Sequence, residues 1–249
     1  MVIAVVNQKG GTGKTTTTVN VGRVLATKNY KVLLVDLDPQ GNLSYSLGVN
    51  QFEHSVANVL RNEVSIVDAV IEIEKEDMDV LPTSTQLAKL ELSQTDAVET
   101  AYSLKNALSE LGDHYDFVLI DCPPSLSWLT INALSAADKV LIPMQLDVFS
   151  IQGLSQIIAT IEEMKDQYNN NLEILGVLAV MVDARKKLTK EVIDHVVNNF
   201  EVNVFKHQIR TNVKAAEAPS FGESVINYAP SSNSASDYIA ATEEILASM

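Results

Sequence analysis

The stretch VIAVVNQKGGTGKTT, residues 2–16, decides the fold. Its first part, Val2 to Val6, is a short apolar run of the kind that forms a buried parallel strand. A glycine-rich loop follows, and apolar residues then recur at helical spacing from Thr15 to Thr27. A second apolar run, Val32 to Val35, is closed by Asp36. The order strand, loop, helix, strand predicts a βαβ unit with a right-handed parallel crossover.

Strand and helix patterns keep alternating along the rest of the chain. Alternation of this kind predicts an α/β fold with a doubly wound, mostly parallel sheet flanked by helices. No internal repeat or low-complexity linker divides the sequence, so we expect residues 1–249 to form a single domain. Further strands are expected at residues 80–81, 117–120, 140–142, 174–182 and 202–205, and helices near residues 65–73, 96–111, 150–167, 187–200 and 234–248.

Composition limits the classes of function that need to be considered. The chain has 18 Lys and Arg residues against 32 Asp and Glu, a formal net charge of −14, so any binding to nucleic acid requires a local basic patch. The only cysteine, Cys122, excludes an intrachain disulfide framework and a Cys-rich metal site, and it fits a reducing cytoplasm. The sequence shows no signal-peptide pattern and no run of the ~18 apolar residues that suggests a membrane span.

The loop after the first strand has the composition of a phosphate-binding loop, or P-loop, in the strand-to-helix context that such a loop requires. Its glycines allow backbone N–H groups to approach phosphate oxygens, and the following helix points its positive end at the same place. Lys14 adds a charge for the β and γ phosphates, and the Thr15 hydroxyl is placed to ligate Mg²⁺. The usual motif has glycine where Gln8 stands, and Lys9 adds a second lysine. The residues expected to contact the nucleotide here are Lys9, Gly10, Gly11, Thr12, Gly13, Lys14, Thr15 and Thr16.

Two carboxylates follow the second predicted strand in the segment VDLDPQGN, residues 35–42. Strand alternation places Asp36 and Asp38 on the same side, at the carboxyl edge of the sheet where ligands bind. We assign to Asp38 the role of holding the attacking water or its proton, which phosphoryl transfer to water requires. The alternative is that both acids only cap a turn before Pro39.

Another apolar run ends in a carboxylate in the segment FVLIDCPP, residues 117–124. This is the Walker B arrangement, in which Asp121 reaches Mg²⁺ directly or through water. Many strands end in Asp, so the motif gains its meaning from the P-loop. The expected magnesium site comprises Thr15, Asp38 and Asp121.

In this order, the segments KGGTGKT, VDLDPQGN and IDCPPS resemble the ParA branch of the deviant Walker ATPases, which includes the chromosomal Soj proteins and is related to MinD. The resemblance implies the P-loop NTPase fold and a single P-loop ATPase domain over residues 1–249. Because the first strand begins at residue 2, the chain resembles the short form of the family, without an N-terminal DNA-binding domain. Further segments that carry the resemblance are Leu129–Leu134, Ile142-Pro143, Gly153–Gln156 and Glu217–Ser220.

The resemblance also implies a function, which is that of a switch driven by ATP and Mg²⁺. Two subunits of such a protein sandwich two ATP molecules, and Lys9 reaches across to the phosphates of the partner. Lys9, Lys14 and Asp38 are then the catalytic residues. The ATP-bound homodimer is expected to bind DNA without sequence preference, and a ParB-like or cargo-linked protein is expected to stimulate slow hydrolysis during chromosome or plasmid partitioning. The implied location is the cytoplasm, on the nucleoid.

The family's DNA-binding positions fall on Arg185 and Lys214 in this sequence, and Lys186 and Lys187 add charge beside the first. Phosphate contacts of this kind give salt-sensitive affinity that does not depend on sequence. The alternative is a solvated helix start that happens to carry lysines. Thr211 stands where an arginine is common in the family, which weakens the match.

The nucleobase has no motif of its own in this sequence. We expect its pocket to draw on Met181 and on the segment Arg210, Thr211 and Asn212. The histidines lack the spacing of metal ligands, so no second metal site is predicted.

Several competing hypotheses remain. A MinD-like membrane positioner requires a basic amphipathic helix, and no Lys or Arg follows Lys214. A reductase like the nitrogenase iron protein requires two cysteines per subunit for a shared cluster, and only Cys122 is present. The sequence does not separate DNA segregation from the positioning of a protein cargo, such as a compartment or a chemoreceptor cluster, on the nucleoid. A module that binds ATP without turnover also stays open, although Lys9 and Asp38 argue against it.

Overall fold

The computed structural model describes residues 1–93, 100–183, 185 and 187–249. Within them, seven strands form one sheet in the order β3-β4-β2-β5-β1-β6-β7, which confirms the predicted α/β class. The antiparallel edge strand β3 pairs with β4, and the other neighbouring strands run parallel. The strands are β1 (Val2–Val5), β2 (Val32–Asp36), β3 (Ile71–Ile73), β4 (Met78–Leu81), β5 (Phe117–Asp121), β6 (Lys139–Gln145) and β7 (Glu173–Val180).

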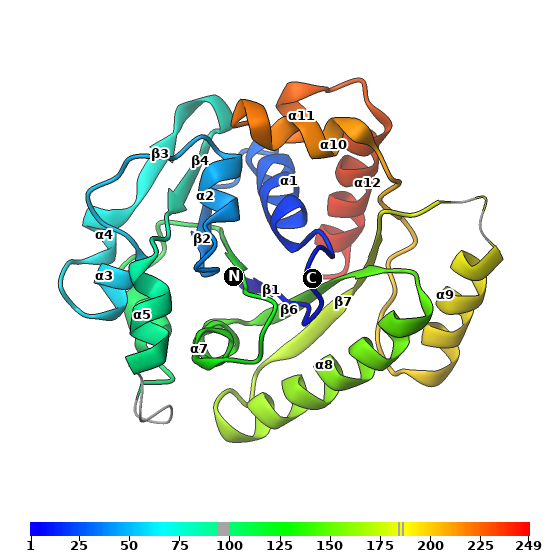
Figure 1. The fold of residues 1–249 in the computed structure, drawn as a ribbon, viewed down its shortest axis with the longest axis horizontal. Helices are drawn as coiled ribbons and strands as arrows, with labels where there is room; N and C mark the ends of the chain where they lie inside the picture. Colours follow the sequence, from blue (N-terminus) through cyan, green and yellow to red (C-terminus); the bar gives the residue numbers. More distant parts are fainter. Residues whose placement is uncertain (94–99, 184, 186) are drawn as a thin grey trace.

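Helices cover both faces of the sheet, as Figure 1 shows. Successive side chains of a strand point to opposite faces, so each buried strand feeds two cores. In β2, Leu33 and Val35 belong to one core with α7 and α8, whereas Val32 and Leu34 belong to the other with α1 and α12. The longer helices are α1 (Lys14–Thr27), α5 (Gln86–Ser93), α6 (Ser103–Ser109), α7 (Trp128–Ala136), α8 (Val148–Gln167), α9 (Lys187–Asn199) and α12 (Asn233–Ala247).

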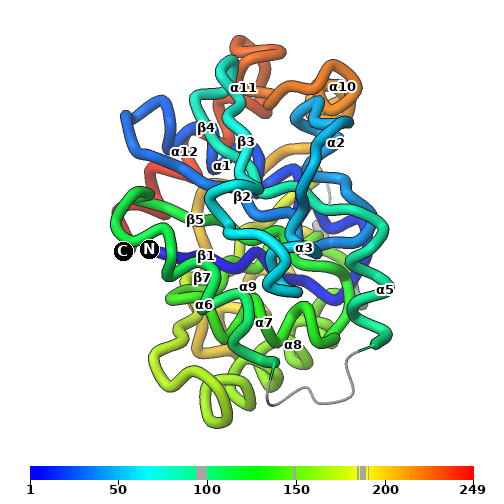
Figure 2. The backbone as a smooth tube through the Cα atoms, turned by 90° about the vertical axis from the view of Figure 1, so that its left-hand side faces the viewer, coloured from blue at the N-terminus to red at the C-terminus, as the bar shows by residue number. Residues whose placement is uncertain are grey.

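Short helices fill the connections. They are α2 (Asn42–Ser46), α3 (Val56–Leu60), α4 (Ile66–Ala69), α10 (Val213–Glu217) and α11 (Val225–Tyr228), with the 3₁₀ turns η1 (Glu74–Glu76) and η2 (Ala218–Phe221). Figure 2 shows the two chain termini near one another, away from α2 and α10. No helix in the described ranges has both the length and the apolar character needed to span a membrane.

The register of three strands brings the sequence motifs together. β5 lies between β2 and β1, with Asp121 opposite Val5 on one side and opposite Asp36 on the other. Because all three strands are parallel, their carboxyl ends meet at one edge of the sheet. The glycine-rich loop that follows β1 therefore lies beside both acidic segments.

Three predicted elements were wrong in extent. The helix expected over residues 65–73 ends at Ala69, because the β-branched segment Ile71–Ile73 pairs with β4 as an edge strand. The strand expected over residues 202–205 makes only an isolated bridge, Val204 to Val177. Of the helix expected over residues 96–111, Ser103–Ser109 is helical, and residues 94–99 lie outside the described part of the chain.

Candidate functional site

The glycine-rich loop adopts a conformation that depends on glycine. Gly11 and Gly13 have φ values of 75° and 72°, in the left-handed region that side chains disfavour. A Cβ atom built on Gly10 or Gly11 meets nothing within 4 Å, so both residues face open space. Helix α1 begins at Lys14, directly after Gly13. The loop thus forms a cradle, with the positive end of a helix at its base.

Side chains from neighbouring elements hold this loop in place. Asn7 accepts a hydrogen bond from the Lys9 N–H at 3.0 Å and donates to the Pro143 carbonyl at 2.7 Å. At the other side, Gln145 Nε2 donates to the Gly11 carbonyl at 3.2 Å. The Pro143 carbonyl and the Gln145 side chain, both in β6, therefore hold the loop in place. The sequence analysis missed Asn7 and Gln145, because no local pattern marks a side chain that braces a distant loop.

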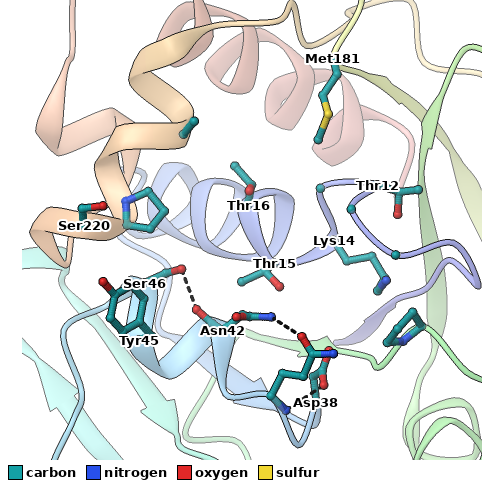
Figure 3. A pocket seen from close by; sticks show the side chains of 17 residues that line it. Thr12, Lys14, Thr15, Thr16, Asp38, Asn42, Tyr45, Ser46, Met181 and Ser220 are labelled. Carbon is teal, nitrogen blue, oxygen red and sulfur yellow. Dashed lines mark hydrogen bonds between the residues drawn. The ribbon is translucent and has the colours of Figure 1, made fainter.

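A cavity of about 500 Å³ opens in front of the loop, and we call it the phosphate cavity (Figure 3). Its volume suits the phosphate chain of a nucleotide. One wall is the predicted loop from Gly10 to Thr16, and the opposite wall comes from the segment after β2 and from α10–η2. The wall residues are Asp38, Gln40, Asn42, Tyr45, Ser46, Pro124, Met181, Ala216, Pro219 and Ser220.

Lys14 is the buried cation of the phosphate cavity. Burial lowers the pKa of this lysine, while the nearby charges of Asp121 and Asp38 act in the opposite direction. Its Nζ lies 3.5 Å from the Lys9 carbonyl oxygen, at the limit of a hydrogen bond. A cation that has lost hydration without gaining a close counter-ion is stabilised by an arriving anion. The position therefore fits a phosphate group.

Thr15 and Asp121 meet as predicted, at the metal side of the cavity. The Thr15 hydroxyl donates to Asp121 Oδ2 at 2.6 Å. Burial raises the pKa of Asp121 well above its usual value, and the charge of Asp36 adds to this effect. Asp121 Oδ1 is buried and has no hydrogen-bond partner within the described residues. Burial also raises the pKa of Cys122, which keeps it a neutral thiol rather than a nucleophile.

This pair passes a test of whether Mg²⁺ fits. A divalent cation would satisfy the orphaned carboxylate oxygen and stabilise the charged form of Asp121, and the Thr15 hydroxyl is a suitable oxygen ligand. Mg²⁺ is usually held by one or two carboxylates together with substrate phosphates, and a Thr–Asp pair beside the phosphate cavity suits that pattern.

The two acids after β2 have different surroundings. Asp36 is fully buried and accepts hydrogen bonds from the backbone N–H and the hydroxyl of Ser44, at 2.8 and 2.7 Å. Burial raises the pKa of Asp36 to about 6. Only Asp38 of the two lines the phosphate cavity, and it also accepts from the Gln40 N–H at 2.9 Å. The two roles considered for Asp38, capping a turn and facing the ligand, are thus compatible.

Lys9 lies at the rim and does not line the phosphate cavity. Its Nζ is 2.6 Å from Asp147 Oδ2, and the two side chains are 46% and 35% exposed. Asp147 precedes α8 and also accepts from the Ser150 N–H at 2.9 Å. No local sequence pattern predicts this ion pair, because its partners are 138 residues apart in the chain. It holds the Lys9 ammonium outside the lining of the phosphate cavity.

A smaller cavity of about 190 Å³, the side pocket, adjoins the phosphate cavity, with which it shares Gly13, Thr16, Met181 and Ala216. The predicted base-binding residues all line it, namely Met181, Arg210, Thr211 and Asn212. Met181 has a φ of 54°, an uncommon value for a residue other than glycine, Asn or Asp. The mostly apolar lining of the side pocket suits a flat heterocycle.

The predicted DNA-contacting residues lie on two different elements. Arg185 follows β7, and its guanidinium donates two hydrogen bonds to the carboxylate of Asp183, from Nε at 2.9 Å and from Nη2 at 3.0 Å. Lys214, in α10, pairs with Glu217 at 2.8 Å and lies 5.5 Å from the centre of the Tyr228 ring. Lys187 begins α9, although its side chain, like the whole of Lys186, lies outside the described atoms. The acidic partners are a feature that the sequence analysis did not anticipate.

A parallel sheet in which β1 leads into a glycine cradle, with a buried lysine at the helix start and a Thr–Asp pair beside it, defines a P-loop NTPase. The AAA domain family matches residues 1–174. The sporulation initiation inhibitor protein Soj of Bacillus subtilis is 42% identical over 248 residues, which cover 99% of this chain and 98% of Soj. The chromosome partitioning protein ParA of Caulobacter vibrioides is 42% identical over 231 residues, which cover 91% of this chain and 86% of that protein.

The chain belongs to the Soj/ParA family of P-loop ATPases. Its fold also matches a solved structure of cobyrinic acid a,c-diamide synthase from Mycobacterium smegmatis with bound ATP analog and magnesium. That protein superposes with a TM-score of 0.79 at 35% identity, over 94% of this chain and 97% of the other. The predicted fold class and family are therefore confirmed.

Proposed function

We propose that this protein is a ParA-type switch that binds ATP with Mg²⁺, dimerises, binds DNA without sequence preference and hydrolyses ATP slowly. A ParB-like partner would stimulate hydrolysis, and the biological role would be chromosome or plasmid partitioning. The support comes from the full-length similarity to Soj and ParA and from the geometry of the phosphate cavity. The M. smegmatis structure, solved with an ATP analog and magnesium, supports the choice of ligands.

One observation carries the proposal of a dimer, namely the position of Lys9. The loop contains two lysines, but only Lys14 is buried in the phosphate cavity. Lys9 is exposed at the rim and paired with Asp147, outside the lining of the phosphate cavity. A lysine at that place acts on a nucleotide only when a second subunit faces it. It would then supply charge to the transition state, as an arginine finger does.

The remaining roles follow from the site. Lys14 offsets the negative charge of the phosphates, and Thr15 with Asp121 would hold Mg²⁺. The ion, when bound, supplies positive charge that stabilises the leaving phosphate oxygens. Asp38 faces the phosphate cavity and orients the attacking water, accepting its proton as the bond to phosphorus forms. The side pocket takes the adenine, through Met181 and the loop from Arg210 to Asn212.

DNA binding would involve Arg185 and Lys214, whose side chains are 90% and 50% exposed and pair with Asp183 and Glu217. Exposed ion pairs contribute little free energy, about 0–1 kcal/mol, so either side chain can leave its partner for a DNA phosphate. Lys186 and Lys187 would add charge beside Arg185. The net charge of −14 would restrict the contact to the surroundings of these basic residues.

The experiment that tests the proposal is binding to nonspecific duplex DNA at low and moderate salt. The protein is compared without nucleotide, with ADP and with ATP, alongside an Asp38→Ala variant with ATP. We expect tight binding only with ATP, stronger binding by the variant, and a steep loss with salt. Binding that is absent in every state, although ATP binds, would remove the DNA step and direct attention to a protein partner or cargo.

Matched variants locate the DNA contact. Arg185→Ala and Lys214→Ala should each weaken binding to all sequences and reduce the salt slope by about 1. Lys28→Ala removes a lysine that pairs with Glu243 at 2.8 Å, and it serves as the control because it leaves both elements unchanged. Equal losses in the three variants would contradict the assignment and indicate a diffuse charge effect.

A further inference from the structure

The carboxylate of Asp237, near the start of α12, holds both the backbone and the side chain of Arg210. It accepts from the Arg210 N–H at 3.0 Å, from Nε at 2.9 and 3.2 Å, and from Nη2 at 2.6 Å. Asp237 is only 9% exposed. A carboxylate that binds a guanidinium with two oxygens and a backbone N–H as well fixes the position of a residue unusually firmly.

Arg210 belongs to the loop that forms one wall of the side pocket. Backbone hydrogen bonds also join this loop to β7 and the residues after it. The Ile209 N–H donates to the Ala179 carbonyl at 2.9 Å, and the Thr211 N–H donates to the Val182 carbonyl at 3.1 Å. The loop is therefore clamped between the end of the sheet and α12. Asp237 provides the α12 half of this clamp, and the wall of the side pocket depends on it.

We propose that Asp237 is a positioning residue for nucleobase binding, which sets the width of the side pocket by fixing Arg210. The inference rests on the proposed function, in which the side pocket takes the adenine of ATP. Asp237 does not line the side pocket, so it acts through Arg210 and makes no contact of its own with the base. It belongs with the base-recognition apparatus, separate from the residues that hold phosphates and Mg²⁺.

The same helix offers a matched comparison in Glu244. Its carboxylate accepts from the backbone N–H groups of Lys206 and His207, both at 2.9 Å, and contacts the His207 ring at 2.8 Å. Like Asp237, it ties α12 to the chain that follows α9, but neither it nor its partners line the side pocket. If Asp237 only stabilised the fold, replacing either carboxylate would change the binding of ATP to a similar extent.

The test measures the binding of ATP and of inorganic tripolyphosphate, each with Mg²⁺, to wild type, Asp237→Asn and Glu244→Gln. The amide of Asp237→Asn carries no charge and has only one acceptor oxygen, so it cannot replace both of the carboxylate oxygens that hold the Arg210 guanidinium. We therefore expect the Kd for ATP to rise on the order of tenfold, which corresponds to the loss of a charge-assisted hydrogen bond. For Asp237→Asn, the Kd for tripolyphosphate should stay unchanged and the preference for ATP over GTP should fall. For Glu244→Gln, the Kd values for both ligands should stay unchanged.

Arg210→Gln gives a second approach if Asp237→Asn does not fold. It keeps the backbone bond and loses the guanidinium, so a smaller rise in the Kd for ATP is expected, and the double variant should be no worse than Asp237→Asn alone. An unchanged Kd for ATP in both single variants, or equal losses for ATP and tripolyphosphate, would overturn the inference. If wild type binds tripolyphosphate but shows no gain from the adenosine of ATP, the proposed function itself fails.

Discussion

Replacing Asp147 by Asn should strengthen ATP-dependent dimerisation. In the single subunit, the Lys9 ammonium is held 2.6 Å from Asp147 Oδ2, outside the phosphate cavity. If Lys9 crosses to a partner, each subunit must first break this ion pair. Asparagine removes the charge but still accepts from the Ser150 N–H, which now donates to Asp147 Oδ1 at 2.9 Å, so the start of α8 is preserved.

The size of the effect follows from the exposure of the pair. Its side chains are 46% and 35% exposed, so the interaction falls in the range of surface ion pairs, about 0.2–1 kcal/mol. A symmetric dimer breaks two such pairs, which gives about 0.4–2 kcal/mol in total. The dissociation constant of the dimer should therefore fall by about twofold to thirtyfold. Salt screens exposed charges, so the difference should shrink as salt is raised.

Sedimentation velocity with ATP and Mg²⁺ measures this constant. Both proteins should carry Asp38→Ala, so that hydrolysis does not deplete the dimer during the run. Glu243→Gln is the control, because it breaks an exposed ion pair with Lys28 far from the phosphate cavity. A dissociation constant that is unchanged or higher in Asp147→Asn would refute the reasoning, since Lys9 would then not be restrained by Asp147 before it crosses.

Three further changes test the site. Asp38→Ala should keep the affinity for ATP within a few fold while phosphate release at saturating ATP falls by about 10²–10⁴-fold; parallel losses of both would reject its role as the base. The folded pKa of Asp36 is about 6 against an ordinary value of 3.8, so the native state binds the proton more tightly. The nucleotide-free protein should therefore lose about 2 kcal/mol of stability from this group as the pH rises from about 4 to 6.5, and Asp36→Asn should lack that loss in urea unfolding. Coincident pH profiles would contradict the burial argument. Gly13→Ala places a side chain at a φ of 72°, so it should lower the free energy of unfolding by about 1–2 kcal/mol in the same assay and weaken the binding of ATP, measured by titration. Unchanged values of both would show that the loop tolerates another conformation.

The local parts of the fold and site were predictable because their signals are local. The apolar run, the glycines and Lys14 are contiguous in sequence, and they determine a strand, a turn and a helix start. Thr15 and Asp121 were both expected at the magnesium site, and in the structure a hydrogen bond of 2.6 Å joins them at the edge where the parallel strands end. These expectations required only the direction of the strands.

The rest depends on contacts that no local pattern encodes. In the sequence, nothing distinguishes Asp147 and Asp237 from other acidic residues. Their roles become visible only in the folded structure, where Asp147 pairs with Lys9 and Asp237 binds Arg210. Short helices such as α10 are too short to be stable alone, and depend on caps and packing. The edge strand Ile71–Ile73 exists because β4 is beside it, so its pattern of only three residues did not reveal it.

The insertion of β5 between β2 and β1 has a consequence for how the protein is made. Synthesis delivers β1 and β2 long before residues 117–121, so the two older strands wait with unpaired hydrogen-bonding edges facing an empty slot. Such edges invite aggregation, and the nascent chain therefore passes through a vulnerable interval in which β1 and β2 both lack the strand that joins them. Since β5 brings Asp121, its entry joins β2 to β1 and also supplies the hydrogen-bond partner of Thr15.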